Sequence, residues 1–321
     1  MTIKHLLKPR KCPQCESIAY KVLSEKDGFE FAKCSKCALI YVPNILIENA
    51  HISKELVTKP NVDYRINSPK VARIKTVFKF LNKYSNNKDK VSILDFGCGN
   101  GLYLKFAKQL GYKNIYAVDI NSQAVENARS IGAKSFCGNL KDWNLPDEGI
   151  DLIVMDNVIE HFENTKETLS ECSRILKNKG IIFISTPNID SFIIKMLGTA
   201  HRHFGGAEHL TYFTIPTLCA ICATAGFKPA SIKTALEELT ITRMLNIVLK
   251  RNLLDYDFDS SEYKEKQSNA PAPSKSSKGN KIFINIFKFF MIPFDFILIN
   301  MTNMFKQGAY IDSFFIKDTQ K

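Results

Sequence analysis

Residues 94–101 read LDFGCGNG, and this stretch decides the fold. The apolar run VSIL leads into Asp95, glycines alternate at positions 97, 99 and 101, and the helix-like segment LYLKFAKQLG follows. Glycine is needed where the backbone turns sharply beside a ligand, because a Cβ would intrude. The N–H groups of the turn and of the helix start favour a polar or anionic group. The stretch therefore predicts the first strand–turn–helix unit of a doubly wound sheet.

The spacing of the glycines separates two classes of cofactor. A dinucleotide fingerprint, G-x-G-x-x-G, requires glycine or alanine three positions after the second glycine. Here Gly101 comes one position early, Leu102 stands at the fingerprint position, and Asp95 lies two positions before the first glycine. The motif alone also fits a tight strand–helix turn in another α/β domain, so the residues that follow are needed to distinguish the two interpretations.

A second acid lies where the next strand is expected to end. The run NIYAVDI carries Asp119, 22 residues beyond Gly97. A carboxylate at that place can accept both ribose hydroxyls of an adenosine, and the alternative is a surface Asp that caps the helix of SQAVENARSI. TKETLSECSRILKNKG then predicts a helix with a cationic end and a glycine stop, and GIIFISTPN predicts a fifth strand. This alternation of strands and helices argues for a parallel sheet covered on both faces.

From residue 91 to about residue 230 the chain resembles the core of the class I S-adenosylmethionine-dependent methyltransferases. The subgroup indicated includes ubiquinone-biosynthesis O-methyltransferases and many methyltransferases of polysaccharide gene clusters. The resemblance implies an α/β, doubly wound, Rossmann-like sheet of seven strands whose last strand runs antiparallel. It is carried by LDFGCGNG, VDI, DLIVMDNVIEH, LKNKGIIFISTPN and EHLTYFTIPTLCAICATAGF.

The resemblance also implies where S-adenosylmethionine would bind. Asp95 and the backbone of the glycine turn would hold the methionine part, Asp119 would hold the ribose, and the chain at Asn139 would flank the adenine. The family usually has Asp where Asn139 stands, so we expect weaker electrostatics there rather than lost binding. The residues expected to bind the cofactor are Asp95, Gly97, Gly99, Gly101, Asp119, Ile120, Asn139 and Leu140.

Candidate catalytic residues follow the fourth and fifth strands. Methyl transfer needs alignment of the reactants and removal of a proton, so a base should lie at the carboxyl edge of the sheet. Glu160 and His161 follow the fourth strand, and the resemblance suggests that they contact substrate or metal; the alternative is a capping His beside an exposed Glu. His209 shares the segment HRHFGGAEHLTYF with His201 and His203. A substrate loop, a base, a metal site and a satisfied loop histidine all remain open for this segment.

Two C-x-x-C pairs near the N-terminus predict a small zinc-binding module outside the core. Cys12 and Cys15 are separated from Cys34 and Cys37 by 18 residues, which is the spacing of a four-thiolate zinc ribbon. Between them lie alternating residues and a DG turn signal. The alternatives are disulfides or a redox pair. MTIKHLLKPRK lacks the apolar core of a signal peptide, so we expect a reducing cytosol that disfavours disulfides. Such a zinc ion is structural, because its site is closed.

The charge is concentrated outside the predicted core. Net charge is +10 over residues 1–90, −2 over 91–240 and +4 over 241–321, which together give the +12 of the chain. A basic appendage can contact nucleic acid, an anionic membrane or a phosphorylated substrate, or it is simply a Lys-rich solvated face. We expect a zinc ribbon at 1–45, linking helices that roof the cofactor site at 46–90, a methyltransferase core at 91–240, and a mobile linker, apolar helices and the final core strand at 241–321.

The apolar segment 282–305 leaves two interpretations open. Lys288, Pro293 and Asp295 interrupt it, so we expect no transmembrane span. It is either buried against the substrate cap of the core or makes peripheral contact with a membrane. The expected location is accordingly the cytoplasm, either free or peripheral at the inner face of the membrane.

The function expected from these patterns is transfer of a methyl group from S-adenosylmethionine to an oxygen, in preference to carbon. No NPPY or DPPY run follows the fourth strand, which argues against amino-group acceptors. The expected acceptor is a small or lipid-linked molecule such as a sugar or polysaccharide intermediate or a quinone precursor. One alternative is an RNA methyltransferase with an N-terminal zinc module, against which the core's charge argues. The other is a non-catalytic zinc-ribbon interaction protein with a relic core.

Overall fold

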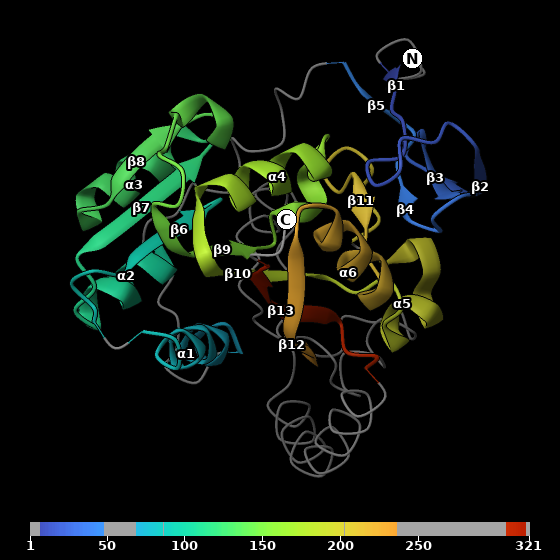
Figure 1. Cartoon of the computed structure of the whole chain (residues 1–321). Helices are drawn as coiled ribbons and strands as arrows, with labels where there is room; N and C mark the ends of the chain where they lie inside the picture. The colour runs from blue at the N-terminus through green and yellow to red at the C-terminus, as the bar shows by residue number, and fades with distance from the viewer. Residues whose placement is uncertain (1–6, 48–68, 86, 202, 236–305, 319–321) are drawn as a thin grey trace, which may run out of the picture. The chain divides into compact units, whose positions relative to one another are not determined.

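The structure, a computed structural model, describes residues 7–47, 69–85, 87–201, 203–235 and 306–318 (Figure 1). All of them fall within one compact unit. The apolar segment 282–305 and residues 48–68 of the predicted linking region lie outside the described residues. Within the described ranges, none of the helices combines the length and the apolar character needed to cross a membrane.

A seven-stranded sheet forms the centre of this unit, in the order β12-β13-β10-β9-β6-β7-β8. The strands from β10 to β8 run parallel, whereas β13 is antiparallel to both β10 and β12. The expected doubly wound sheet with an antiparallel last strand is therefore confirmed. Its strands are β6 (Ser92–Phe96), β7 (Asn114–Asp119), β8 (Lys134–Cys137), β9 (Ile150–Asp156), β10 (Leu176–Pro187), β12 (Phe227–Ala235) and β13 (Tyr310–Lys317).

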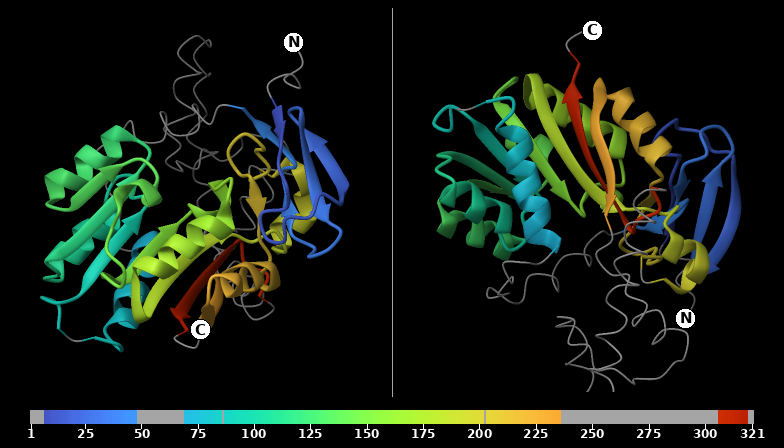
Figure 2. Two further views of the ribbon diagram at one scale, coloured as in Figure 1. Left: turned by 45° about the horizontal axis from the view of Figure 1, so that its top comes forward. Right: turned by 90° about the horizontal axis from the view of Figure 1, so that it is seen from below.

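Helices cover both faces of this sheet (Figure 2). One face packs Leu94 of β6 against α4 and α6, and the other packs Ile93 against α1, α2 and α3. Successive strand residues point to opposite faces, so a strand buried on both sides needs the continuous apolar run seen in the sequence. The helices are α1 (Pro69–Leu81), α2 (Leu102–Gln109), α3 (Ser122–Ile131), α4 (Thr165–Ile175), α5 (Phe192–Leu197) and α6 (Ile215–Thr224).

The helix expected through LKNKG is shorter than predicted. It ends at Ile175, and Leu176 already pairs with Ile150 as the first residue of β10. Leu176 is fully buried. Burying this side chain in the sheet outweighs the helical propensity of the Lys-rich residues that follow, which lie at a register irregularity before Ile181.

The N-terminal residues form the predicted hairpin, and a strand from the core extends it. Asp27 and Gly28 connect β2 to β3 with φ of +53° and +82°, as a two-residue hairpin turn requires. The ribbon sheet has the order β11-β4-β3-β2, and β11 belongs to the segment that follows the histidine cluster. The strands are β1 (Leu7–Pro9), β2 (Tyr20–Lys26), β3 (Phe29–Cys34), β4 (Ile40–Tyr41), β5 (Asn44–Leu46) and β11 (Thr211–Tyr212).

Candidate functional site

The glycine turn after β6 borders open space at Gly99. Gly97 has φ of +71°, and a Cβ added there would lie 2.5 Å from Cγ2 of Val158. Gly99 also has positive φ, but a Cβ there would meet nothing within 4 Å. The turn is therefore closed on the β9 side at Gly97 and open at Gly99, which is the arrangement that lets a ligand approach the backbone.

Asp119, at the end of β7, holds this turn in place. Its Oδ2 accepts a hydrogen bond from the backbone N–H of Gly99 at 3.0 Å, and its Oδ1 accepts from the N–H of Asn121 at 2.9 Å. The alternative role of capping α3 belongs to Asn121, whose side chain accepts from the first-turn N–H groups. Ile120, the next residue, is 57% exposed and leaves an apolar surface beside the carboxylate.

Asp95 is a buried carboxyl group, and one of its oxygens lacks a hydrogen-bond partner in the described part of the chain. It is 3% exposed, and its Oδ2 has no hydrogen-bond partner among the described residues. Burial raises the pKa of Asp95 to about 7; Lys70 opposes this rise, and Asp156 and Asp119 add to it. A cationic ligand beside this buried carboxyl group would stabilise its ionised form.

The exit of β8 brings the predicted adenine-binding residues to the same edge. The N–H of Gly138 donates to the carbonyl oxygen of Asp119 at 3.0 Å. Asn139 and Leu140 follow at the start of a short 3-10 helix, Leu140–Trp143. Leu140 is buried, whereas Asn139 is exposed and donates from Nδ2 to Asp142 at 3.5 Å. The structure thus brings the predicted cofactor residues to one edge of the sheet.

Glu160, His161 and His209 converge after β9. One ligand atom from each lies within 4.8 Å of the others. Glu160 is 1% exposed and accepts from the hydroxyl of Thr186 at 2.9 Å through Oε2. Burial raises the pKa of Glu160, while the nearby His161 opposes the shift. The His161 and His209 rings meet edge to face with centroids 4.8 Å apart.

The histidine cluster continues from His209 toward β13. The ring of His203 lies 5.6 Å from that of His209 and 4.7 Å from that of His201. The hydroxyl of Tyr310 lies 3.3 Å from Nε2 of His203. The ring contacts therefore form a row in the order His161, His209, His203 and His201, with His201 at the far end from His161.

A family profile described as a methyltransferase domain matches residues 70–232, about half of the chain. The chain belongs to this methyltransferase-domain family.

Relatives of this methyltransferase domain include proteins with named activities. Over 102 residues it is 32% identical to a probable S-adenosylmethionine-dependent methyltransferase of Mycobacterium tuberculosis, covering 31% of this chain and 37% of the relative. Over 124 residues it is 29% identical to a ubiquinone biosynthesis O-methyltransferase of Rickettsia bellii, covering 36% and 50%. An S-adenosylmethionine-dependent methyltransferase structure from Archaeoglobus fulgidus aligns over 76% of this chain and 94% of that chain, with 20% identity and a TM-score of 0.45. The chain spans half or less of the length of these two curated relatives.

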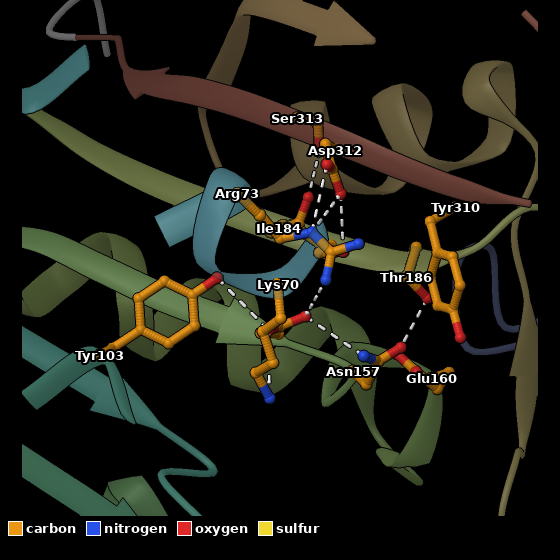
Figure 3. Close-up of polar contacts among 12 residues, drawn as sticks. Lys70, Arg73, Tyr103, Asn157, Glu160, Ile184, Thr186, Tyr310, Asp312 and Ser313 are labelled. Atoms are coloured by element: carbon orange, nitrogen blue, oxygen red, sulfur yellow. Dashed lines mark hydrogen bonds and ion pairs between the residues drawn. The ribbon is translucent and has the colours of Figure 1, made fainter. Parts of the chain in front are cut away.

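The methyltransferase domain also contains a buried charge network that the sequence did not reveal (Figure 3). Arg73 of α1 donates from Nε to Asp312 of β13 at 3.0 Å and from Nη1 to Asp156 of β9 at 3.2 Å. Ser185 donates to Asp312 at 2.8 Å, and Tyr103 donates to Asp156 at 3.3 Å. This network ties α1 to the strand ends beside the glycine turn. An acid at the end of the fourth strand, Asp156, was the one sequence signal that could have indicated it.

The four ribbon cysteines form the predicted cluster. The Sγ atoms of Cys12 and Cys37 lie 3.4 Å apart, those of Cys15 and Cys34 lie 3.5 Å apart, and all four lie within 4.8 Å of one another. Zinc–sulfur bonds of about 2.3 Å require tetrahedral sulfur separations of about 3.8 Å. Burial tends to raise the pKa of Cys34, but backbone N–H groups and the neighbouring thiols outweigh it and lower the value to about 7. None of the described cysteines forms a disulfide.

Proposed function

We propose that the protein transfers a methyl group from S-adenosylmethionine to an oxygen, in preference to a carbon, of a small or lipid-linked acceptor. Sugar or polysaccharide intermediates and quinone precursors are the acceptor classes that we favour. The observation that carries the proposal is the open glycine turn at Gly99, whose N–H donates to Asp119, together with the Oδ2 of the buried Asp95, which is unpartnered within the described ranges. When bound, the cofactor supplies an electrophilic methyl group on a sulfonium.

The residues at this edge fit such a ligand. Asp95 would bind the ammonium group of the methionine part through its unpartnered Oδ2. Asp119 uses one backbone N–H for each oxygen, and each oxygen keeps a lone pair for a ribose hydroxyl. Ile120 offers an exposed apolar surface, and Asn139 an amide, for the adenine. Gly97 and Gly101 keep the turn in the backbone conformation that leaves this space clear.

His161 is the group that we propose as the base. Its Nδ1 lies 2.8 Å from the carbonyl oxygen of Glu208. A carbonyl oxygen only accepts, so Nδ1 carries the hydrogen, and in the neutral ring Nε2 is then the acceptor. Nε2 of His161 would take the proton of the acceptor hydroxyl as the carbon–oxygen bond forms and the methyl–sulfur bond breaks, which would leave the cofactor as a neutral thioether. His209 and the buried Glu160 would orient the His161 ring.

We also propose that the ribbon holds one structural zinc ion. Four thiolates at nearly tetrahedral spacing form a closed site that leaves no coordination position for a substrate. The zinc would stabilise the fold of the ribbon because the ligands come from two separate turns.

A labelled-methyl screen tests the proposed acceptor class. The purified full-length protein is incubated with S-adenosylmethionine labelled in its methyl group and with a hydroxylated quinone precursor, a sugar nucleotide, a lipid-linked sugar, or structured RNA. We expect label on oxygen in one of the first three, and loss of at least a hundredfold in rate for His161→Gln, because proton transfer contributes about that factor. His201→Gln, at the far end of the histidine row, is the matched control. Label found on RNA, or on nitrogen, would contradict the proposal.

An added arm distinguishes the base from a metal ligand. Glu160, His161 and His209 converge closely enough for a divalent cation. A rate that a chelator abolishes and added Mn²⁺ or Zn²⁺ restores in the wild type, but not in Glu160→Gln, would assign these residues to a metal, because imidazole suits transition metals. A rate unchanged by the chelator supports proton transfer by the His161 ring.

A further inference from the structure

Arg10 is a buried cation that lies where the ribbon meets the methyltransferase core. It is 7% exposed and stands two residues before the first cysteine of the ribbon. Its guanidinium donates to the backbone carbonyl oxygens of Phe162 (2.7 Å), Glu163 (2.7 and 2.9 Å) and Leu210 (2.6 Å), and to the hydroxyl oxygen of Thr211 (3.0 Å).

The partners of Arg10 come from two segments that carry the candidate catalytic residues. Phe162 and Glu163 directly follow His161, and Leu210 and Thr211 directly follow His209. One guanidinium therefore spans both segments. A planar group with five donors in a fixed fork suits this task, whereas the three donors of an ammonium group all lie on one nitrogen and cannot reach both segments as widely.

Backbone hydrogen bonds join the same two segments to the ribbon. The carbonyl oxygen of Leu210 accepts from the N–H of Val42 at 3.0 Å as well as from Arg10. The N–H of Leu210 donates to the carbonyl oxygen of Glu160 at 2.9 Å. Through β11 and β4, Tyr212 is paired with Ile40 of the ribbon. The peptide groups of Leu210 are thus bonded to the ribbon on one side and to the candidate catalytic segment on the other.

The charge of Arg10 is retained in this position. Burial lowers the pKa of Arg10 to about 10, and the nearby Glu163 opposes the shift, so the guanidinium stays protonated at neutral pH. A partly buried ion pair, Lys8–Glu163, and an exposed one, Lys166–Glu16, also join the ribbon to this part of the core. Because surface ion pairs contribute little, the buried guanidinium is the main side-chain connection, beside the backbone pairing of β4 with β11.

We infer that Arg10 is a positioning residue that fixes His161 and His209 relative to each other, so that the ribbon is a structural part of the acceptor site. The buried cation Arg10 is then committed to the core and does not face a nucleic acid. The assignment of His161 and His209 to the acceptor site rests on the proposed function; the connection of their two segments by Arg10 does not.

The test compares Arg10→Gln with Lys11→Gln, which removes the same charge from the next, exposed residue. Hydrogen exchange and the imidazole NMR signals of His161 and His209 are the readouts, together with zinc content and the heat of binding S-adenosylhomocysteine. In Arg10→Gln we expect the Leu210 and Thr211 amides to exchange about tenfold faster and both histidine signals to shift, with zinc content and cofactor affinity unchanged. In Lys11→Gln all readouts should equal those of the wild type. Arg10→Lys should recover only part of the protection, because it keeps the charge without the fork.

Two results would overturn the inference. One is exchange and histidine signals in Arg10→Gln that match those of Lys11→Gln. The other is loss of zinc in Arg10→Gln, which would confine the role of Arg10 to folding of the ribbon. If Arg10→Gln does not fold, Thr211→Val serves instead, because it removes one acceptor on the core side; faster exchange at Leu210 would support the inference, and unchanged exchange would oppose it. Faster exchange in a protein that transfers no methyl group would leave the role of Arg10 standing and remove the proposed function.

Discussion

Cofactor affinity should depend on pH through Asp95. Burial raises the pKa of this carboxyl group to about 7 in the free protein. If its ionised form binds the ammonium group of the cofactor, the protonated form must lose its proton on binding. The association constant should then be constant above about pH 8 and fall about tenfold by pH 6 and about a hundredfold by pH 5, which is about 1.4 kcal/mol for each unit below the pKa.

Whether stability and affinity rise or fall with pH follows from the direction of the pKa shift of Asp95. Because folding raises the pKa of Asp95 from its ordinary value of 3.8, the free protein loses stability from this group as pH rises from about 4 to about 7. A cation bound beside Asp95 reverses the shift, so the ligand binds more tightly as pH rises through the same window. At pH 7 about half a proton should be released for each ligand bound.

Isothermal titration with S-adenosylhomocysteine between pH 5 and pH 8.5 measures this dependence. Two buffers with different ionisation enthalpies report the released proton directly. Asp95→Asn removes the titrating group and should bind more weakly, with affinity that is nearly flat over this range. An affinity in the wild type that is flat, or that rises toward acid pH, would refute the assigned role of Asp95.

Three further substitutions have defined outcomes. Gly97→Ala places a Cβ 2.5 Å from Val158 in a backbone with positive φ, and should lower stability by about 1–3 kcal/mol in a thermal melt, only partly restored by adding Val158→Ala. Arg73→Met removes the cation that bonds Asp312 and one of the two that pair with Asp156, since Lys70 stays 3.6 Å from Asp156; it should cost about 3–5 kcal/mol in urea unfolding, with the larger loss at pH 8 than at pH 5 because protonation relieves the uncompensated charge, and equal losses would oppose this account. Cys34→Ser should reduce zinc from one ion per chain to almost none in elemental analysis, while an unchanged content would show that the four thiols do not bind the metal together.

The parts of the fold that local patterns govern were predictable from the sequence. The glycine turn, the helix of SQAVENARSI and the final strand were predicted and confirmed, because each combines a periodic apolar pattern with a residue that fits the turn or cap. The four-cysteine cluster was predictable for the same reason, since its ligand pairs are encoded by short spacing. The prediction of zinc itself, and the roles of the cofactor-binding residues, stay predictions until a ligand is measured.

Features that depend on contacts distant in sequence were not predictable. The pairing of β4 with β11 joins two strands of two residues each, too short to give an alternating pattern. Arg10 and Arg73 could not be told apart from solvated cations, because nothing near them in sequence reveals that carbonyl oxygens or carboxylates will surround them. The early end of α4 was also not predictable from the sequence, because the burial of Leu176 depends on its partner in β9.

Direct titration of the wild-type protein with S-adenosylmethionine tests the central claim most closely, with a reduced nicotinamide dinucleotide as the competing ligand. The account predicts one binding site per chain for S-adenosylmethionine, at least tenfold weaker binding in Asp119→Ala, and no heat from the dinucleotide. Heat from the dinucleotide alone, or S-adenosylmethionine binding that is the same in Asp119→Ala as in the wild type, would contradict it.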